Sequence, residues 1–438
     1  MINNFPTFPL VLDYGPRLLK TWTPEDEDGL LFALQHLSRT NEIMLSAPQS
    51  TLTEMTAAMV EAAPRLEHLT LHSQSVEFVL PRSFLGGEVP QLRHLILTGV
   101  SLATLRPLLP SATSLVSLVL ERIPSSAYFP PDSLVAHIRA MPHLQTLSLG
   151  FLTAAPRPRF GTGRFLPPGQ IAPVELPALT QLIYRGVSAY IDALLARIRT
   201  PLIQDVDITL FNQLTLRIPH IRAFIHDLEA FQPTRARIDF AQASAQIIVS
   251  VPQPSESPDI SLSVSCARLD FQVSAMAQIC SGLFGTSTGT GAGALLLPVV
   301  EELMLGFNPE EEQRDEDVVD PALWRALLSS FQHARTLRVH VALAADLSRA
   351  LRPTDGSAAV GEDPGPEPET VPEPEPLLLL PELRTVVLLH GDDEGVLATA
   401  SNALRAFVDG RNRAGRPVNV EPRNLSRLSS WPPRPAKS

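Results

Sequence analysis

The chain has 438 residues, of which 44% are hydrophobic and 6% aromatic, and its formal net charge is −11. This acidity argues against a nucleic-acid binder, which needs a basic surface, and no apolar run approaches the ~18 residues of a membrane helix. The two cysteines, Cys266 and Cys280, are too few for a disulfide framework and lack metal-type spacing. With no secretory signal at the start, we expect an intracellular protein, cytoplasmic or nuclear, that needs no metal or cofactor.

Residues 1–45 are predicted to form an N-terminal cap and a first repeat. Leu10–Leu12 has the alternation of a strand. Thr23 can cap a helix that has Pro24 at its first position, and acidic residues follow in the first turn, where they suit the helix dipole. A first copy of the repeat ends at Ile43-Met-Leu45.

Residues 46–350 carry a recurring phrase: Pro, any residue, an apolar residue, two spacers, Leu, one spacer, Leu. Copies begin at Pro64, Pro90, Pro142, Pro177 and Pro298, and another follows at Pro381; the copy at Leu115 lacks the proline. Leu66, Leu92, Leu115, Leu144, Leu179 and Ile203 mark the register, at intervals of 26, 23, 29, 35 and 24 residues. These intervals scatter around the length of leucine-rich repeats.

Each phrase predicts a short strand, because leucines two residues apart share one face of a strand. Amphipathic helices are predicted between the phrases, at Thr51–Ala63, Ser133–Met141, Ala189–Ile198 and Pro321–Phe331. The proline of the phrase ends the helix before it. We therefore expect an α/β fold: an irregular leucine-rich-repeat solenoid, or horseshoe, with a parallel concave sheet and helices on the convex side.

The phrase is blurred at residues 240–295, although Ile247–Val251 and Ile260–Val264 still alternate as strands. The glycine-rich run Gly282–Gly293 invites comparison with a phosphate-binding loop. It lacks the Lys-Ser or Lys-Thr of that motif and no strand is predicted to lead into it, so we expect a loop. The cluster from His390 to Glu394 is expected to be a solvated turn rather than a metal site.

Residues 351–376 are predicted to be a disordered acidic insert. Pro353–Pro376 holds seven prolines, seven acidic residues and no basic ones, so it cannot bury a core. Residues 377–422 are expected to form a last repeat and a C-terminal cap, with a helix at Gly395–Val408. The tail at 423–438 is expected to be loose.

The sequence supports no Ser/His/Asp or Cys/His constellation, so no catalytic residue is predicted. The candidate site is instead the exposed side of the repeat strands, where residues beside the buried leucines would line the concave face. These candidate partner-binding residues are His68, Thr70, His72, His94, Thr98, Glu121, Arg185, Asp205, Asp207, Arg338 and His340.

The repeats resemble those of the F-box and leucine-rich-repeat proteins of mushroom-forming fungi. The segment from Pro381 to Val418, the opening Pro9–Asp13 and the segment Trp324–Val339 are also similar to that family. The resemblance implies repeats that select substrates for a cullin ubiquitin ligase, with an F-box that docks on the ligase adaptor. Residues 1–40 lack the Leu-Pro-x-Glu start of an F-box, so an adaptor is expected as a partner only if an F-box lies upstream.

We therefore expect a non-enzymatic protein-binding module that takes a protein on its concave face. The resemblance implies the substrate-recognition part of an F-box-type receptor. The alternatives are a structural scaffold without a link to ubiquitin, and a nucleotide-binding enzyme built on the Gly282–Gly293 loop. Neither nucleic acid nor a membrane is expected as a partner.

Overall fold

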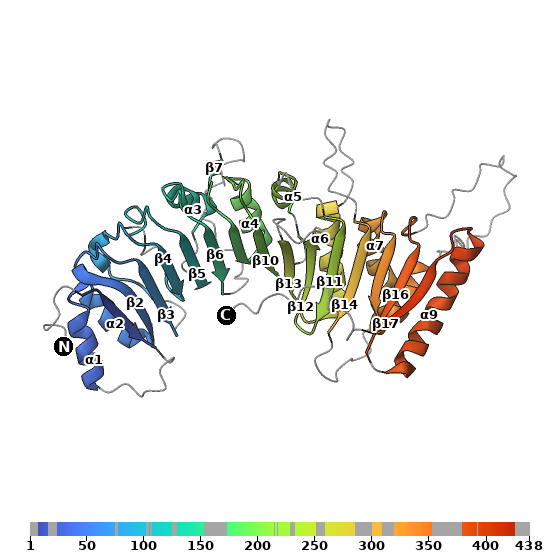
Figure 1. Ribbon diagram of the computed structural model, residues 1–438, viewed down its shortest axis with the longest axis horizontal. Coiled ribbons are helices and arrows are strands. Elements are labelled where there is room, and N and C mark those ends of the chain that lie inside the picture. The colour runs from blue at the N-terminus through green and yellow to red at the C-terminus, as the bar shows by residue number, and fades with distance from the viewer. Residues whose placement is uncertain are drawn as a thin grey trace, which may run out of the picture. The chain divides into compact units, whose positions relative to one another are not determined.

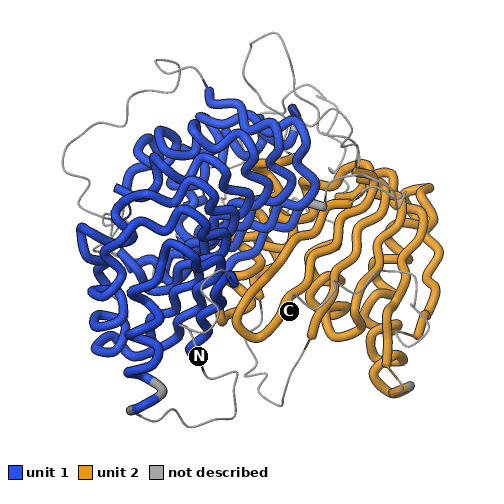
Figure 2. Tube along the Cα trace, turned by 60° about the vertical axis from the view of Figure 1, so that its left-hand side comes forward, with its two compact units in different colours: residues 1–231, 253–265 blue, residues 232–252, 266–438 orange. Residues whose placement is uncertain are grey.

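The computed structural model describes residues 8–15, 24–74, 78–101, 105, 107–124, 129–152, 173–213, 215–216, 218–227, 233–250, 259–284, 300–308, 319–352, 379–391 and 393–424. Two compact units divide the chain (Figure 2). Unit 1 consists of Met1–Phe231 and Gln253–Ser265, and unit 2 of Gln232–Pro252 and Cys266–Ser438.

Unit 1 is built on a parallel sheet with one strand per repeat (Figure 1). Its strands, in spatial order, are β1 (Leu10–Tyr14), β2 (Thr40–Ala47), β3 (His68–Ser73), β4 (His94–Thr98), β5 (Ser117–Ile123), β6 (Thr146–Phe151), β8 (Gln181–Gly186), β10 (Asp205–Phe211) and β13 (Asp259–Ser265). A separate short parallel pair joins β7 (Val174–Glu175) to β9 (Ile198–Arg199).

The leucines of the phrase form continuous buried rows across this sheet. Leu69 pairs with Leu95, Leu95 with Leu118, and Leu118 with Leu147, and all four side chains are at most 1% exposed. In most copies the first leucine of the phrase closes a turn by donating its N–H to the carbonyl three residues earlier, as Leu92 does to Val89 at 3.1 Å. The repeat therefore fixes both the core row and the turn that leads into each strand.

Helices and turns cover the leucine side of the sheet in unit 1. The helices are α1 (Pro24–Ala33), α2 (Gln49–Ala58), α3 (Pro131–Ile138), α4 (Ser188–Leu195) and α5 (Pro219–His226), with single helical turns at Leu37–Arg39 and Phe84–Gly87. Tyr184 of β8 takes the position of the last leucine, and its ring stacks on Tyr190 of α4 with centroids 6.0 Å apart. Among the described residues of unit 1, the opposite side of the sheet carries no helix.

Unit 2 has the sheet order β12 (Ser244–Ser250), β11 (Arg235–Ala241), β14 (Glu302–Phe307), β15 (Thr336–His340), β16 (Thr385–His390) and β17 (Asn419–Asn424). Its helices are α6 (Leu269–Phe284), α7 (Pro321–Leu328), α8 (Ala344–Leu351) and α9 (Glu394–Arg413), with single turns at Ser329–Phe331 and Val341–Leu343. Trp324 of α7 is fully buried edge-on against Phe240 of β11, with centroids 5.5 Å apart.

The sheet departs from the expected parallel arrangement at one place, because β11 and β12 are antiparallel. The two strands are separated by only two residues, Gln242 and Ala243, which leaves no room for the helix that a parallel crossover needs. This hairpin explains why the phrase is blurred after residue 240. The α/β leucine-rich-repeat fold itself is confirmed, with a mostly parallel sheet in each unit.

Several segments predicted from the sequence lie outside the described residues. They include Pro353–Pro376, residues 285–293 of the glycine-rich run, and 425–438 of the tail. The predicted boundaries at residues 45, 350, 376 and 422 stay predictions. Among the described residues, no helix has both the length and the apolar character needed to cross a membrane.

Candidate functional site

The candidate site lies on the side of the unit 1 sheet that faces away from the helices, here called the open face. Strand residues alternate between buried and half-exposed, so that His68, Thr70 and His72 of β3 lie on the open face while the leucines between them are buried. The register then aligns these positions into rows. His68 pairs with His94, and Thr98 with both His72 and Glu121.

Two of the predicted residues form a stacked pair. The rings of His68 and His94 are parallel within 7°, with centroids 4.4 Å apart. Burial lowers the pKa of His94, and the neighbouring His68 and Arg93 lower it further, whereas Glu67 raises it. The stacked arrangement therefore favours the neutral form of His94, since two stacked imidazolium rings would repel each other.

Thr98 was predicted to lie on the exposed surface, but the structure buries it, and its side chain is only 5% exposed. It is a short side chain between two longer neighbours, His72 and Glu121, on the adjacent strands. It is therefore not available to a partner in the way the alternation of β4 suggests.

Glu121 and Arg185 are exposed and make no side-chain hydrogen bond or ion pair within the described residues. Glu121 lies at a break in the register between β5 and β6, next to Arg122, whose φ is 51°. Such bulges re-aim side chains at the edge of a ladder. Asp205 accepts a hydrogen bond from Gln181 Nε2 at 2.8 Å, and Asp207 is half-exposed in the same strand.

Arg338 and His340 belong to unit 2 and have internal contacts there. Arg338 forms an ion pair with Glu302, which also pairs with Arg235 at 3.1 Å. His340 Nδ1 accepts a hydrogen bond from the Ala342 N–H at 3.3 Å and so begins the turn that follows β15. Both side chains thus support the fold of unit 2, a role that their residue types did not reveal.

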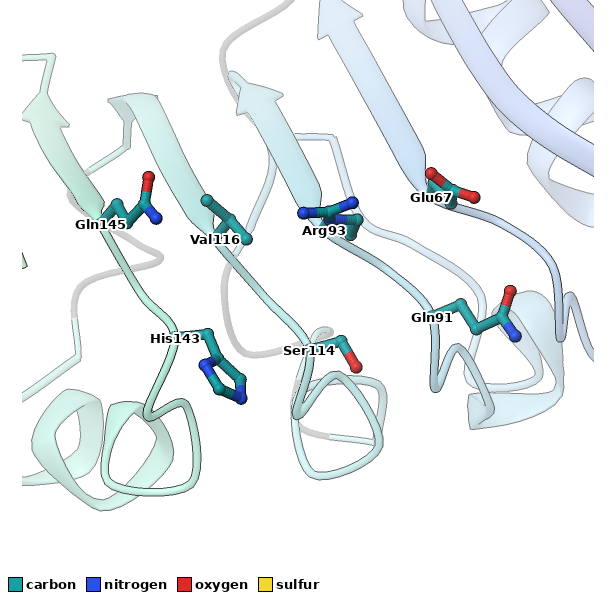
Figure 3. A pocket seen from close by; sticks show the side chains of 7 residues that line it. All are labelled: Glu67, Gln91, Arg93, Ser114, Val116, His143 and Gln145. Carbon is teal, nitrogen blue, oxygen red and sulfur yellow. The ribbon is translucent and has the colours of Figure 1, made fainter. Parts of the chain in front are cut away.

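The structure adds a groove that the sequence prediction missed, with a volume of about 450 Å³. It lies where the chain enters β3 to β6 (Figure 3). The lining residues are Glu67, Gln91, Arg93, Ser114, Val116, His143 and Gln145. The signal for them was present in the phrase. The first leucine of each copy is buried, so the residues on both sides of it must point outward.

The depth of the groove comes from differences in side-chain size between neighbouring repeats. The repeat of β5 places Ser114 and Val116 at these two positions, whereas the flanking repeats place longer polar side chains there. The short residues form a floor, Gln91 and Arg93 form one wall, and His143 and Gln145 form the other (Figure 3).

The backbone under the groove is held by a repeated hydrogen-bond pattern. The carbonyl of Arg93 accepts the N–H groups of Val116 and Ser117, at 2.8 and 2.9 Å, and the carbonyl of Val116 accepts those of Gln145 and Thr146, at 2.7 and 3.1 Å. The side chains above this backbone make no hydrogen bond or ion pair within the described residues. Backbone hydrogen bonds therefore hold the base of the groove in place, while the side chains that line it are available for contacts with a ligand.

The same two positions in unit 2 are occupied by charged residues that pair with one another. Arg335 lies 3.0 Å from Glu301 and 3.7 Å from Glu382, and Glu382 also meets His333 at 2.8 Å. The hydrogen bond from His333 and the nearby Arg335 hold the pKa of Glu382 below its usual range. Unit 2 thus satisfies these side chains internally, whereas unit 1 leaves Arg93 and Glu67 without an ion pair among the described residues.

Two kinds of catalytic site, a metal centre and a reactive thiol at Cys280, find no support among the described residues. No group of three or more His, Cys, Asp or Glu side chains among them could hold a metal ion. Cys280 is fully buried in α6, and burial raises the pKa of its thiol, which makes it a poor nucleophile. A helix, α6, leads directly into the glycine-rich run, where a phosphate-binding loop would need a strand.

The turns, strands and helices that share one leucine register give this chain an α/β leucine-rich-repeat fold. No family model matches the chain, and no curated protein matches it. Among solved structures, it is similar to the leucine-rich-repeat-containing protein LegL7 from Legionella pneumophila. The identity is 13% and the TM-score 0.28, over 91% of this chain and 97% of that chain.

Proposed function

We propose that this chain is a non-enzymatic protein-binding module and that the open face of unit 1 contacts the partner. The observation that carries the proposal is the set of side chains on this face, such as His72, Glu121 and Arg185, that form no hydrogen bond or ion pair with any other described residue. They project from strands whose other side is a packed leucine core. Polar side chains on a rigid framework give a partner fixed points to recognise.

The test is partner capture by cross-linking in extracts, followed by binding measurements with the purified partner. We expect Glu121→Arg and Arg185→Glu each to weaken binding by about tenfold, because a reversed charge at an interface repels its former counterpart. Glu54→Arg on α2 and Arg139→Glu after α3 make the same charge changes on exposed residues away from the open face. Equal losses from both pairs, or no loss from the first pair, would contradict the proposal.

A finer form of this function is substrate recognition within an F-box-type ubiquitin-ligase receptor. It rests on the resemblance of the repeated phrase to the repeats of that family. Co-purification tests it separately, because a receptor of this type brings down the adaptor of a cullin ligase, whereas a structural scaffold does not. Absence of the adaptor from the captured proteins would remove this form and leave the binding module.

A further inference from the structure

We propose that the groove at the entry to β3–β6 is a binding site for the carboxylate side chain of an Asp or Glu on a partner polypeptide. The proposal rests on the protein-binding function above and adds a site and a ligand chemistry to it. The groove lies beside the predicted surface, in residues that the open-face argument does not use.

The cation of the site is Arg93. Its guanidinium is exposed, lines the groove and has no ion pair or hydrogen bond within the described residues. A guanidinium offers a planar fork of donors that matches a carboxylate, and it keeps its charge at all relevant pH values. An arginine that lines a groove and forms no ion pair within the described residues is therefore suited to take an acid from outside.

The other residues around the floor complete a carboxylate site. Ser114, Gln91, Gln145 and His143 can all donate hydrogen bonds, and Val116 offers an apolar surface for the methylene groups of an Asp or Glu side chain. Figure 3 shows them around the short floor of the β5 repeat.

Glu67 sets a limit on the charge of the ligand. It lies one strand beyond Arg93, on the side away from Val116 (Figure 3). Neighbouring strands are about 4.8 Å apart, so its carboxylate weakens the attraction of this region for anions. A single negative charge placed over Val116 fits this arrangement better than a doubly charged phosphate does.

The experiment is selection of random linear peptides displayed on phage against the full chain, followed by anisotropy measurements on the selected peptides. We expect the selected peptides to share one Asp or Glu. Replacing that acid by its amide, or Arg93→Gln in the protein, is expected to weaken binding by about tenfold. The two changes together are expected to cost little more than either one, because they remove the same contact.

Two further variants sharpen the test. Val116→Trp fills the floor and is expected to abolish binding, with the circular dichroism spectrum as the check on folding. Arg65→Gln removes an exposed arginine of the preceding repeat that does not line the groove, and binding is expected to stay unchanged. Selection without an acidic consensus, an Arg93→Gln variant that binds normally, or an equal loss from Arg65→Gln would each overturn the proposal.

The phosphopeptide alternative is tested in the same assay. Replacing the selected acid by phosphoserine is expected to weaken binding, and markedly tighter binding would overturn the carboxylate assignment. The outcome is also distinguishable from failure of the protein-binding function. A captured partner that is lost on Glu121→Arg but retained by Arg93→Gln and Val116→Trp would keep the function and remove this site.

Discussion

The residues on either side of the first leucine in each repeat combine a fixed backbone with a variable side chain. Arg93 shows this clearly, because its carbonyl holds two N–H groups of the next repeat while its side chain has no hydrogen bond or ion pair in the described part of the chain. Arg335 occupies the same position in unit 2, and its side chain is engaged by Glu301 and Glu382. The same position in the repeat can therefore hold a side chain that forms ion pairs between neighbouring repeats or one that has no such partner among the described residues.

The stacked pair of His68 and His94 makes stability depend on pH. The pKa of His94 lies below its ordinary value of 6.5 in the folded chain, so near that value the unfolded chain binds more protons. Stability contributed by this residue is therefore fully present above the ordinary pKa and is lost as the pH falls from that value through the lower pKa of the folded chain.

We expect the urea concentration at the unfolding midpoint to decrease when the pH is lowered from about 7.5 to about 5.5. The decrease is expected to be smaller in a His94→Asn variant, because asparagine does not titrate. His143→Asn removes an exposed imidazole and is the matched control. Identical pH profiles for the wild type and His94→Asn would show that the environment of His94 does not favour its neutral form.

At the scale of elements, α9 is fastened to the turn before β16 by one buried arginine. Arg411 is 2% exposed and donates to the carbonyls of Leu380 and Leu383, at 3.1 and 2.9 Å. Burial lowers the pKa of this guanidinium, and nearby Arg416 lowers it further. Leu380 has φ = 53°, so the turn is strained and needs such support.

Arg411→Ala is therefore expected to cost about 2–4 kcal/mol of unfolding free energy, because it leaves a cavity and removes the hydrogen bonds that the guanidinium donates to the Leu380 and Leu383 carbonyls. Urea denaturation measures the loss. Arg405→Ala, on an exposed position of the same helix, is expected to change stability by less than about 0.5 kcal/mol. A loss for Arg411→Ala no larger than for this control would mean that the turn holds its shape without the arginine.

The elements also show what the sequence could and could not predict. The leucine rows followed from the spacing of the phrase, and the strands that contain Leu69 and Leu95 lie where it placed them. The hairpin of β11 and β12 could not be predicted, because alternating hydrophobicity identifies a strand but does not say whether it pairs parallel or antiparallel with its neighbour. The groove was not predicted, because the candidate residues, such as Thr70 and His94, were chosen beside the last two leucines of each phrase. Its floor instead depends on the small size of Ser114 and Val116, which flank the first leucine.

At the scale of the whole molecule, the chain passes between its two compact units more than once. Unit 1 ends its first stretch at Phe231 and resumes at Gln253–Ser265, which contains β13. β13 pairs with β10 over seven residues, from Asp205 with Asp259 to Phe211 with Ser265. Unit 1 is therefore not contained in a continuous N-terminal segment.

A fragment of residues 1–231 is expected to associate or aggregate, because loss of β13 opens the edge of β10 to other chains. Joining residues 253–265 to its end through a flexible Gly/Ser linker is expected to reduce this association, because β13 covers the edge of β10 and adds the buried side chains of Ile260, Leu262 and Val264 to unit 1. Size-exclusion chromatography with light scattering distinguishes the two. A 1–231 fragment that stays monomeric at high concentration would show that β13 is dispensable for unit 1.

The different roles of Leu115 and its two neighbours affect which sequence changes this fold can tolerate. Leu115 is fully buried and belongs to the core, while Ser114 and Val116 beside it set the depth of the groove. Substitutions at these two positions are expected to change the size of the groove and to leave the buried leucine in place. A duplicated copy of the gene could therefore acquire a different ligand preference through single codon changes, while every core leucine is retained.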